Sequence, residues 1–164
     1  MGKINLARVD DRLIHGQVMT KWSKGHGTNA LYVVDDATAA DEFMKQIYSN
    51  VNSSANLRVE VYSISEAIDR WHKDQFGKDN VILLFKSIES AKRIIDQGDI
   101  PIKTLNVGGI AKKPGTKSII NSVGLSTEDA ERLKEIASKD IEIFFQMVPD
   151  SRRVSYESAL KAFD

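Results

Sequence analysis

The sequence predicts an α/β fold: a single-domain, open and mainly parallel sheet of about seven strands with helices on both faces. The first observation is that 164 residues, 41% of them apolar, are enough for one compact domain with a sizeable core. The second is that short runs of Val, Ile, Leu and aromatic residues alternate with amphipathic segments, as in parallel sheets covered by helices. We therefore expect residues 1–164 to form one domain.

Seven apolar runs are the predicted strands. They are too short for helices, and most are rich in the residues typical of strands buried on both faces. In chain order they cover residues 4–9, 31–34, 57–62, 81–85, 102–107, 118–123 and 141–145.

Six segments between and after these strands have apolar residues at helical spacing. One stops at Gly98, with Pro101 soon after, and another begins at Ser126 with acidic residues in its first turn. The predicted helices are residues 16–25, 39–51, 65–75, 87–97, 126–138 and 155–163. A loop rich in Gly, Lys and Pro covers residues 108–117.

Composition excludes several classes of function. Lys plus Arg equals Asp plus Glu, 23 each, so no global field attracts nucleic acid or anionic lipid. Without cysteine there is no disulfide framework, thiolate metal site or cysteine nucleophile. No signal peptide and no run of about 20 apolar residues is recognisable. We expect a cytoplasmic protein without direct membrane insertion.

The residues with the clearest chemical role lie in the loop after the first strand. Parallel sheets bind ligands at the carboxyl ends of their strands, and here Arg8, Asp10, Arg12 and His15 fall within eight residues, with Gly16 opening a helix. Imidazole can carry a phosphoryl group, arginine has a donor fork that matches phosphate, and a carboxylate can fix a histidine tautomer. These residues predict a phosphohistidine site, with no metal and no cofactor.

A less specific interpretation of these residues is also open. A single histidine is more often a surface or capping residue, which fits the surroundings of His26 and His72, and loop Arg–Asp pairs are mostly solvated. From the residues alone, the two interpretations of His15 have similar weight.

Two further loops lie at the same predicted edge of the sheet. Asn106, Gly108 and Gly109 follow the fifth strand, and glycine lets backbone amides approach a phosphate closely. An ordinary tight turn explains them equally well. Asp35 and Asp36 follow the second strand and either line the rim of the site or cap the next helix.

Two other functions compete with phosphohistidine chemistry. A signalling receiver would use Asp35-Asp36 as its acidic group, but Lys86 and Lys112 are poorly placed to be its lysine. A nucleotide-binding module would need a glycine-rich phosphate motif, which is absent. Lys112, Lys113 and Lys117 could attract an acidic partner, although a solvated loop is the commoner explanation.

The stretch Arg-Val-Asp-Asp-Arg-Leu-Ile-His-Gly-Gln-Val at 8–18 resembles the active-site loop of enzyme IIB components of the mannose/fructose/sorbose-type sugar phosphotransferase system (PTS). Further matches follow in order along the chain: Val-Val-Asp-Asp at 33–36, Leu-Leu-Phe-Lys-Ser at 83–87, Leu-Asn-Val-Gly-Gly at 105–109 and Gln-Met-Val-Pro at 146–149. The chain departs from the family pattern at 35–38 and 109–110, which bears on the partner and the sugar.

The resemblance implies one IIB domain over residues 1–164 and a specific function. A phosphoryl group would pass from a phosphohistidine of a IIA partner to Nδ1 of His15, and then to sugar bound in the membrane components IIC and IID. Arg12 and Asp10 occupy the supporting positions, and Arg8, Gly16 and Gln17 belong to the same loop. The implied activity is that of a protein-Npi-phosphohistidine–sugar phosphotransferase, peripheral to the membrane through IIC and IID. The sugar and the oligomeric state stay open.

Overall fold

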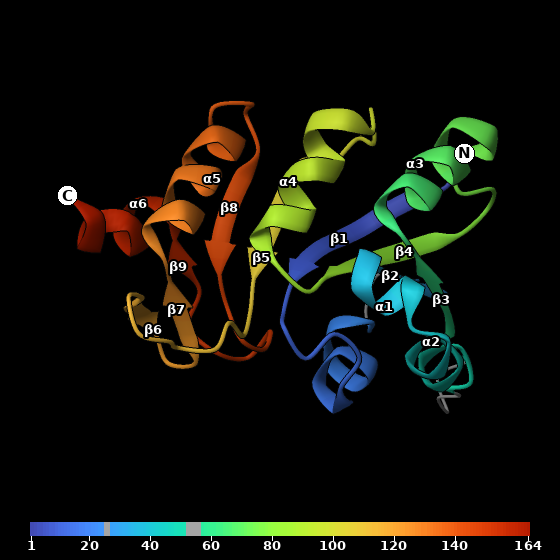
Figure 1. The fold of residues 1–164 in the computed structure, drawn as a ribbon, viewed down its shortest axis with the longest axis horizontal. Coiled ribbons are helices and arrows are strands. Elements are labelled where there is room, and N and C mark those ends of the chain that lie inside the picture. The colour runs from blue at the N-terminus through green and yellow to red at the C-terminus, as the bar shows by residue number, and fades with distance from the viewer. Residues whose placement is uncertain (25–26, 52–56) are drawn as a thin grey trace.

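The computed structural model describes residues 1–24, 27–51 and 57–164 (Figure 1). Its main sheet has seven strands in the order β3-β2-β4-β1-β5-β8-β9, and all neighbours pair in parallel except β8 and β9. The predicted α/β class and mainly parallel sheet are confirmed. The strands are β1 (Lys3–Val9), β2 (Ala30–Val34), β3 (Arg58–Tyr62), β4 (Asn80–Phe85), β5 (Thr104–Val107), β8 (Glu142–Phe145) and β9 (Val154–Ser155).

Helices lie on both faces of this sheet. The larger core fills the face covered by α3, α4 and α5, and the smaller core lies under the segment after β1 and under α1 and α2 (Figure 1). The helices are α1 (Asp36–Ala40), α2 (Glu42–Ser49), α3 (Ile64–Asp74), α4 (Ile88–Gln97), α5 (Thr127–Ala137) and α6 (Tyr156–Ala159). A 3₁₀ turn, Leu160–Phe163, follows α6.

Serine side chains start several helices directly after strands. Ser63 accepts a hydrogen bond from the backbone of Glu66, whose carboxylate accepts one from the Ser63 N–H in return, so α3 begins with a capping box. Ser87 and Ser126 cap α4 and α5 in the same way, without the reciprocal bond. The carboxyl ends of β3 and β4 therefore lead directly into helix starts at one edge of the sheet.

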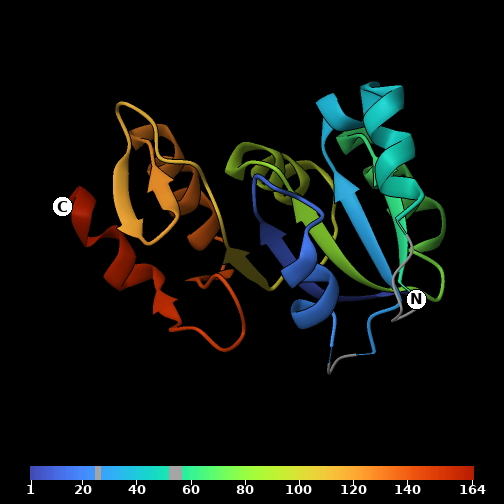
Figure 2. The same cartoon turned by 90° about the horizontal axis from the view of Figure 1, so that it is seen from below.

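The predicted strand at 118–123 is wrong. The chain forms a separate antiparallel hairpin of β6 (Lys117–Ile120) and β7 (Val123–Leu125), seen beside the main sheet in Figure 2. Ser122, inside the predicted run, has a left-handed φ of 69° and helps to reverse the chain. The seventh strand of the main sheet is instead β9, which sequence analysis placed in no strand.

Three helix predictions also need correction. The predicted helix at 39–51 is two helices, because Asp41 ends α1 and caps α2 with its carboxylate. The helix expected at 16–25 covers residues 16–22, with π-helical winding from Val18 to Trp22. Residues 23 and 24 form a turn, and Gly25 and His26 lie outside the described residues. The helix expected at 155–163 is α6 and the 3₁₀ turn. In the described ranges, no helix has the length and apolar character to cross a bilayer.

Candidate functional site

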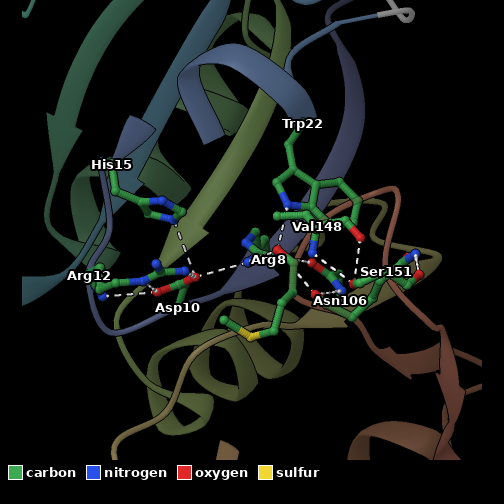
Figure 3. A network of polar contacts seen from close by, with 10 residues as sticks. Arg8, Asp10, Arg12, His15, Trp22, Asn106, Val148 and Ser151 are labelled. Carbon is green, nitrogen blue, oxygen red and sulfur yellow. Dashed lines mark hydrogen bonds and ion pairs between the residues drawn. The ribbon is translucent and has the colours of Figure 1, made fainter. Parts of the chain in front are cut away.

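The candidate site lies at the carboxyl ends of β1, β5 and β8. It consists of the first loop (residues 10–15), the post-histidine helix (residues 16–22) and the loop at 146–151. Figure 3 shows their side chains converging on Arg8 and Asp10. β1 lies between β4 and β5, and β5 pairs with β8, so the sheet order brings these three segments together.

Arg8 is the buried centre of the site. Its side chain has no exposed surface. One terminal nitrogen, Nη1, donates to the side-chain oxygen of Asn106 and, at 3.0 Å, to the carbonyl oxygen of Gln146. The other, Nη2, donates at 2.9 Å to Asp10 Oδ2 and at 2.9 Å to the carbonyl oxygen of Met147. Burial lowers the pKa of Arg8 and the charge of Asp10 opposes this, so the guanidinium stays charged.

Asp10 connects Arg8 to the two other functional candidates of the first loop. Its buried carboxylate accepts hydrogen bonds from Arg12 Nε at 2.9 Å and Nη2 at 2.7 Å, and its Oδ2 lies 3.3 Å from His15 Nε2. Burial alone would raise the pKa of Asp10. The contacts with His15 and Arg12 and the charge of Arg8 outweigh that effect and hold the pKa well below its usual range. Asp10 is therefore a permanent negative charge beside the imidazole.

The backbone of the first loop turns sharply to bring His15 to Asp10. The N–H of Leu13 donates to the carbonyl of Asp10 at 3.0 Å, and Leu13 has a left-handed φ of 56°. This conformation is unfavourable for leucine, but its side chain is buried in the smaller core together with Val18. Burial of Leu13 thus maintains the turn that returns Arg12 and His15 to the carboxylate.

Asn106, Gly108 and Gly109, for which the sequence left phosphate contact and an ordinary turn equally open, form the back wall of the site. Asn106 is fully buried under Arg8. A Cβ on Gly108 would overlap the Arg8 guanidinium, and one on Gly109 would lie 3.2 Å from Asp10 Oδ1. The two glycines therefore make room for a buried ion pair. Gly109 also borders the open cleft beside Arg12, so a phosphate contact there stays a prediction.

The other predicted residues divide into two groups. Gly16 and Gln17 are exposed at the start of the post-histidine helix, directly beside His15 in the chain.

Asp35 caps α1, and Asp36 accepts from the Ile64 N–H at 2.8 Å and pairs with Arg93. The structure therefore supports the capping interpretation of the acidic pair, and their part in partner binding stays a prediction.

The three lysines differ in their surroundings. Lys117 donates to the carbonyl of Ala162 at 2.8 Å and lies over the ring of Phe163, so it fastens the hairpin to the C-terminal turn. Lys112 and Lys113 are exposed. Lys112 lines an open cleft of about 460 Å³ between Arg12 of the first loop and the hairpin.

Sequence analysis assigned no role to the backbone carbonyls of the 146–151 loop. The carbonyls of Gln146 and Met147 hold Arg8, and the Gln146 amide donates to the carbonyls of Pro149 and Ser151. The position of this loop after the last parallel strand and the family match at 146–149 are sequence signals that could have indicated it. Within the described residues, no three His, Asp or Glu side chains are grouped so that they could hold a metal ion.

A family model described as the PTS system sorbose subfamily IIB component matches residues 4–163. The chain belongs to this family of IIB components. It is 30% identical over 161 residues to the PTS system fructose-specific EIIB component of Bacillus subtilis, with 98% of each chain covered. A crystal structure of manxB from Thermoanaerobacter tengcongensis superposes with a TM-score of 0.90 at 41% identity, covering 99% of this chain and 98% of that one.

The mannose-specific EIIAB component of Escherichia coli K12 is 32% identical over 161 residues. That match covers 98% of this chain but 47% of the relative, so this IIB component spans about half of the EIIAB chain. Family membership establishes a phosphocarrier of a sugar phosphotransferase system, which argues against the receiver and nucleotide-binding alternatives.

Asp10→Asn should strongly destabilise this IIB component, because it leaves the buried Arg8 charge without a counter-charge. We expect a loss of about 3–5 kcal/mol in the free energy of unfolding, measured with urea at pH 7. Asp150→Asn is the control: its pair with Lys21 is exposed, so the change should stay within about 0.5 kcal/mol. An Asp10→Asn protein as stable as wild type would contradict the central role of this pair.

The lowered pKa of Asp10 also predicts how the stability difference between wild type and Asp10→Asn depends on pH. A group with a lowered folded-state pKa stabilises the fold above its unfolded pKa, about 3.9 for aspartate, and loses that contribution as pH falls through the folded value. The stability difference between wild type and Asp10→Asn should thus not decline between about pH 8 and pH 5, and should shrink only below about pH 4. A difference that already declines between pH 7 and 5 would contradict the assignment.

Gly108→Ala should also destabilise the protein, since the added methyl group would overlap Arg8 and lie 2.9 Å from Asp10 Oδ2. Neither group can move without losing buried hydrogen bonds. We therefore expect the free energy of unfolding in urea to fall by about 3 kcal/mol or more, the upper end of the range for an overpacked core. Gly16→Ala is the matched control, because a Cβ added at Gly16 would meet no atom within 4 Å. Equal stability of the two variants would refute the close packing at Gly108.

Proposed function

We propose that this IIB component accepts a phosphoryl group on His15 from a phosphohistidine of a IIA protein and donates it to a sugar held by membrane components IIC and IID. The observation that supports this most is the contact of one imidazole nitrogen with a buried, permanently ionised carboxylate. That carboxylate also binds an exposed guanidinium. Imidazole, carboxylate and guanidinium are the groups that a phosphohistidine carrier needs for a nucleophile, a fixed tautomer and charge neutralisation.

The contact with Asp10 indicates which nitrogen reacts. Asp10 Oδ2 lies 3.3 Å from Nε2, and a carboxylate favours the tautomer with the proton on that nitrogen. The lone pair is then on Nδ1, which agrees with the nitrogen that the family pattern implies. The ring is 13% exposed and both of its nitrogens are buried, so Nδ1 has to become accessible when a donor docks.

Arg12 is the group best placed to neutralise the phosphoryl charge. Its side chain is 42% exposed, and its Nε and Nη2 are engaged by Asp10. Within the described chain Nη1 makes no hydrogen bond, which leaves one edge of the guanidinium for phosphate oxygens. The hydrogen bonds with Asp10 raise the pKa of Arg12, so the group is charged throughout.

The transfer needs no metal in this scheme. The Nδ1 lone pair of His15 attacks phosphorus, a new P–N bond forms, and the P–N bond to the donor imidazole breaks with its electron pair returning to that imidazole. In the second step a sugar hydroxyl oxygen attacks phosphorus, the P–N bond to His15 breaks, and the hydroxyl proton is released. Positioning and electrostatics supply the catalysis, as in other phosphoryl transfers.

The partners and location follow from this function. A IIA phosphodonor, the IIC and IID components and the sugar at the transfer step are the proposed partners, and nucleic acid is not among them. The protein would act in the cytoplasm, peripheral to the membrane through IIC and IID, as a protein-Npi-phosphohistidine–sugar phosphotransferase. The first loop, with Gly16 and Gln17 exposed beside it, is the proposed docking point for both proteins in turn.

Phosphorylation by a phosphorylated IIA protein should label His15 alone. His15→Ala should lose all label, and His72→Ala should keep it, because His72 is half exposed and pairs with Asp99 away from the site. Radiolabel and intact mass are the measurements. The label should be acid-labile and base-stable, whereas an acyl phosphate on aspartate is labile to both. Label that survives in His15→Ala would refute the proposal.

Arg12→Ala should slow the transfer from IIA to His15. Arginines that neutralise the transferred group contribute about 10³–10⁵ in rate elsewhere, and we expect an effect at or below that range. Arg12→Lys should restore only part, because a point charge cannot replace the fork. Rapid-quench transfer kinetics in excess chelator measure both variants and test metal independence together. A wild-type rate for Arg12→Ala would contradict the assigned role.

A further inference from the structure

We propose that Trp22 is a positioning residue for phosphoryl transfer, which locks the helix following His15 onto the buried Arg8–Asp10 pair. This inference rests on the proposed function and assigns a task to a residue outside the first loop. The sequence alone predicted no part in the chemistry for Trp22.

Two contacts join Trp22 to the centre of the site. Its ring lies over the Arg8 guanidinium, with 4.8 Å from Cζ to the ring centroid. Its Nε1 donates to the carbonyl oxygen of Met147 at 3.1 Å, and the same oxygen accepts from Arg8 Nη2 at 2.9 Å. Figure 3 shows the indole beside Arg8, opposite the side on which Asp10 lies. Arg8 is thus held between a carboxylate and an aromatic face, an arrangement that favours a desolvated cation.

The post-histidine helix connects the Trp22 contacts to His15. It begins at Gly16, directly after His15, and ends at Trp22, and the Met19 N–H donates to the carbonyl of His15 at 3.1 Å. Its residues from Val18 to Trp22 wind as a π-helix, a rare form that is frequent at functional sites. An extra residue in a helix rotates the side chains after it by about 100°. This winding therefore decides which face Trp22 presents, and here the indole faces Arg8.

The result is a closed loop of contacts. Asp10 contacts His15, His15 is bonded to the helix, the helix ends in Trp22, and Trp22 contacts the Arg8 that pairs with Asp10. Without the indole, the helix loses its hydrogen bond to Met147 and keeps the exposed Lys21–Asp150 pair with the 146–151 loop, and Arg8 loses the aromatic face. Since small displacements of a reacting group reduce transfer rates strongly, Trp22 should affect the reaction without touching the phosphoryl group.

Trp22→Leu and Trp22→Phe test this role in the full chain, with phosphorylated IIA as donor and rapid-quench kinetics as readout. Trp22→Leu should lower the transfer rate at saturating donor by about tenfold to a hundredfold, with the half-saturating donor concentration nearly unchanged. Trp22→Phe keeps a ring over Arg8 and should restore part of the rate. Trp71→Phe is the matched control: this other tryptophan is in the core under α3, so its variant should transfer at the wild-type rate.

A double-mutant cycle separates positioning from general destabilisation. If Trp22 acts through Arg8 and Asp10, Trp22→Leu should cost little further rate in an Asp10→Asn background. Asp10→Glu, which keeps the charge but displaces the carboxylate from Arg8, replaces Asp10→Asn if that variant does not stay folded in circular dichroism. A wild-type rate for Trp22→Leu, or an equal loss in both backgrounds, would overturn the inference while leaving His15 as the acceptor. Failure of the wild-type protein itself to accept phosphate would overturn this inference and the proposed function together.

Discussion

The ion pair between Arg8 and Asp10 is the interaction on which the site depends. Both side chains are fully buried, and removing two charges from water is costly unless every donor and acceptor finds a partner. Both terminal nitrogens of Arg8 find partners here, on backbone carbonyls, an amide and the carboxylate, whereas its Nε is buried without a hydrogen bond among the described residues. Asp10 also contacts Arg12 and His15, so the positions of these two side chains depend on the buried pair. A buried charge network of this kind has one good arrangement, so it fixes the geometry of an exposed loop.

The sheet topology explains why this pair can form. The chain builds β2 and β3 on one side of β1 and returns through β4, then places β5 and β8 on the other side. Arg8 stands beside Asn106 in the parallel register, and Asn106 stands beside Phe144, just before the carbonyls of the 146–151 loop. Such a change of direction at a strand end is where open parallel sheets bind ligands. The fold and the site therefore have the same origin.

The sequence predicted the parts of this arrangement that have a pattern. Buried strands are apolar runs, and the cluster of charges between Arg8 and His15 is unusual directly after such a run. The sequence did not predict the hairpin, β9 or the π-helical winding. None of their causes produces a periodic pattern: a chain reversal at Ser122, a strand of two residues, and one extra residue in a helix. Asn106 and Gly108 were predicted to lie at the site, but their contacts with Arg8 were not predicted. A glycine in the sequence indicates only that some group approaches the backbone closely, and at Gly108 that group is the guanidinium of Arg8.

The central claim is that Asp10 orients His15 so that one defined nitrogen carries the phosphoryl group. The direct measurement is phosphorus–nitrogen coupling by NMR on protein labelled with ¹⁵N-histidine and phosphorylated by its IIA donor. The account predicts a single phosphohistidine, with phosphorus bonded to Nδ1 of His15, because Nε2 faces the carboxylate at 3.3 Å. Phosphorus on Nε2 of His15, or on another residue, would contradict it.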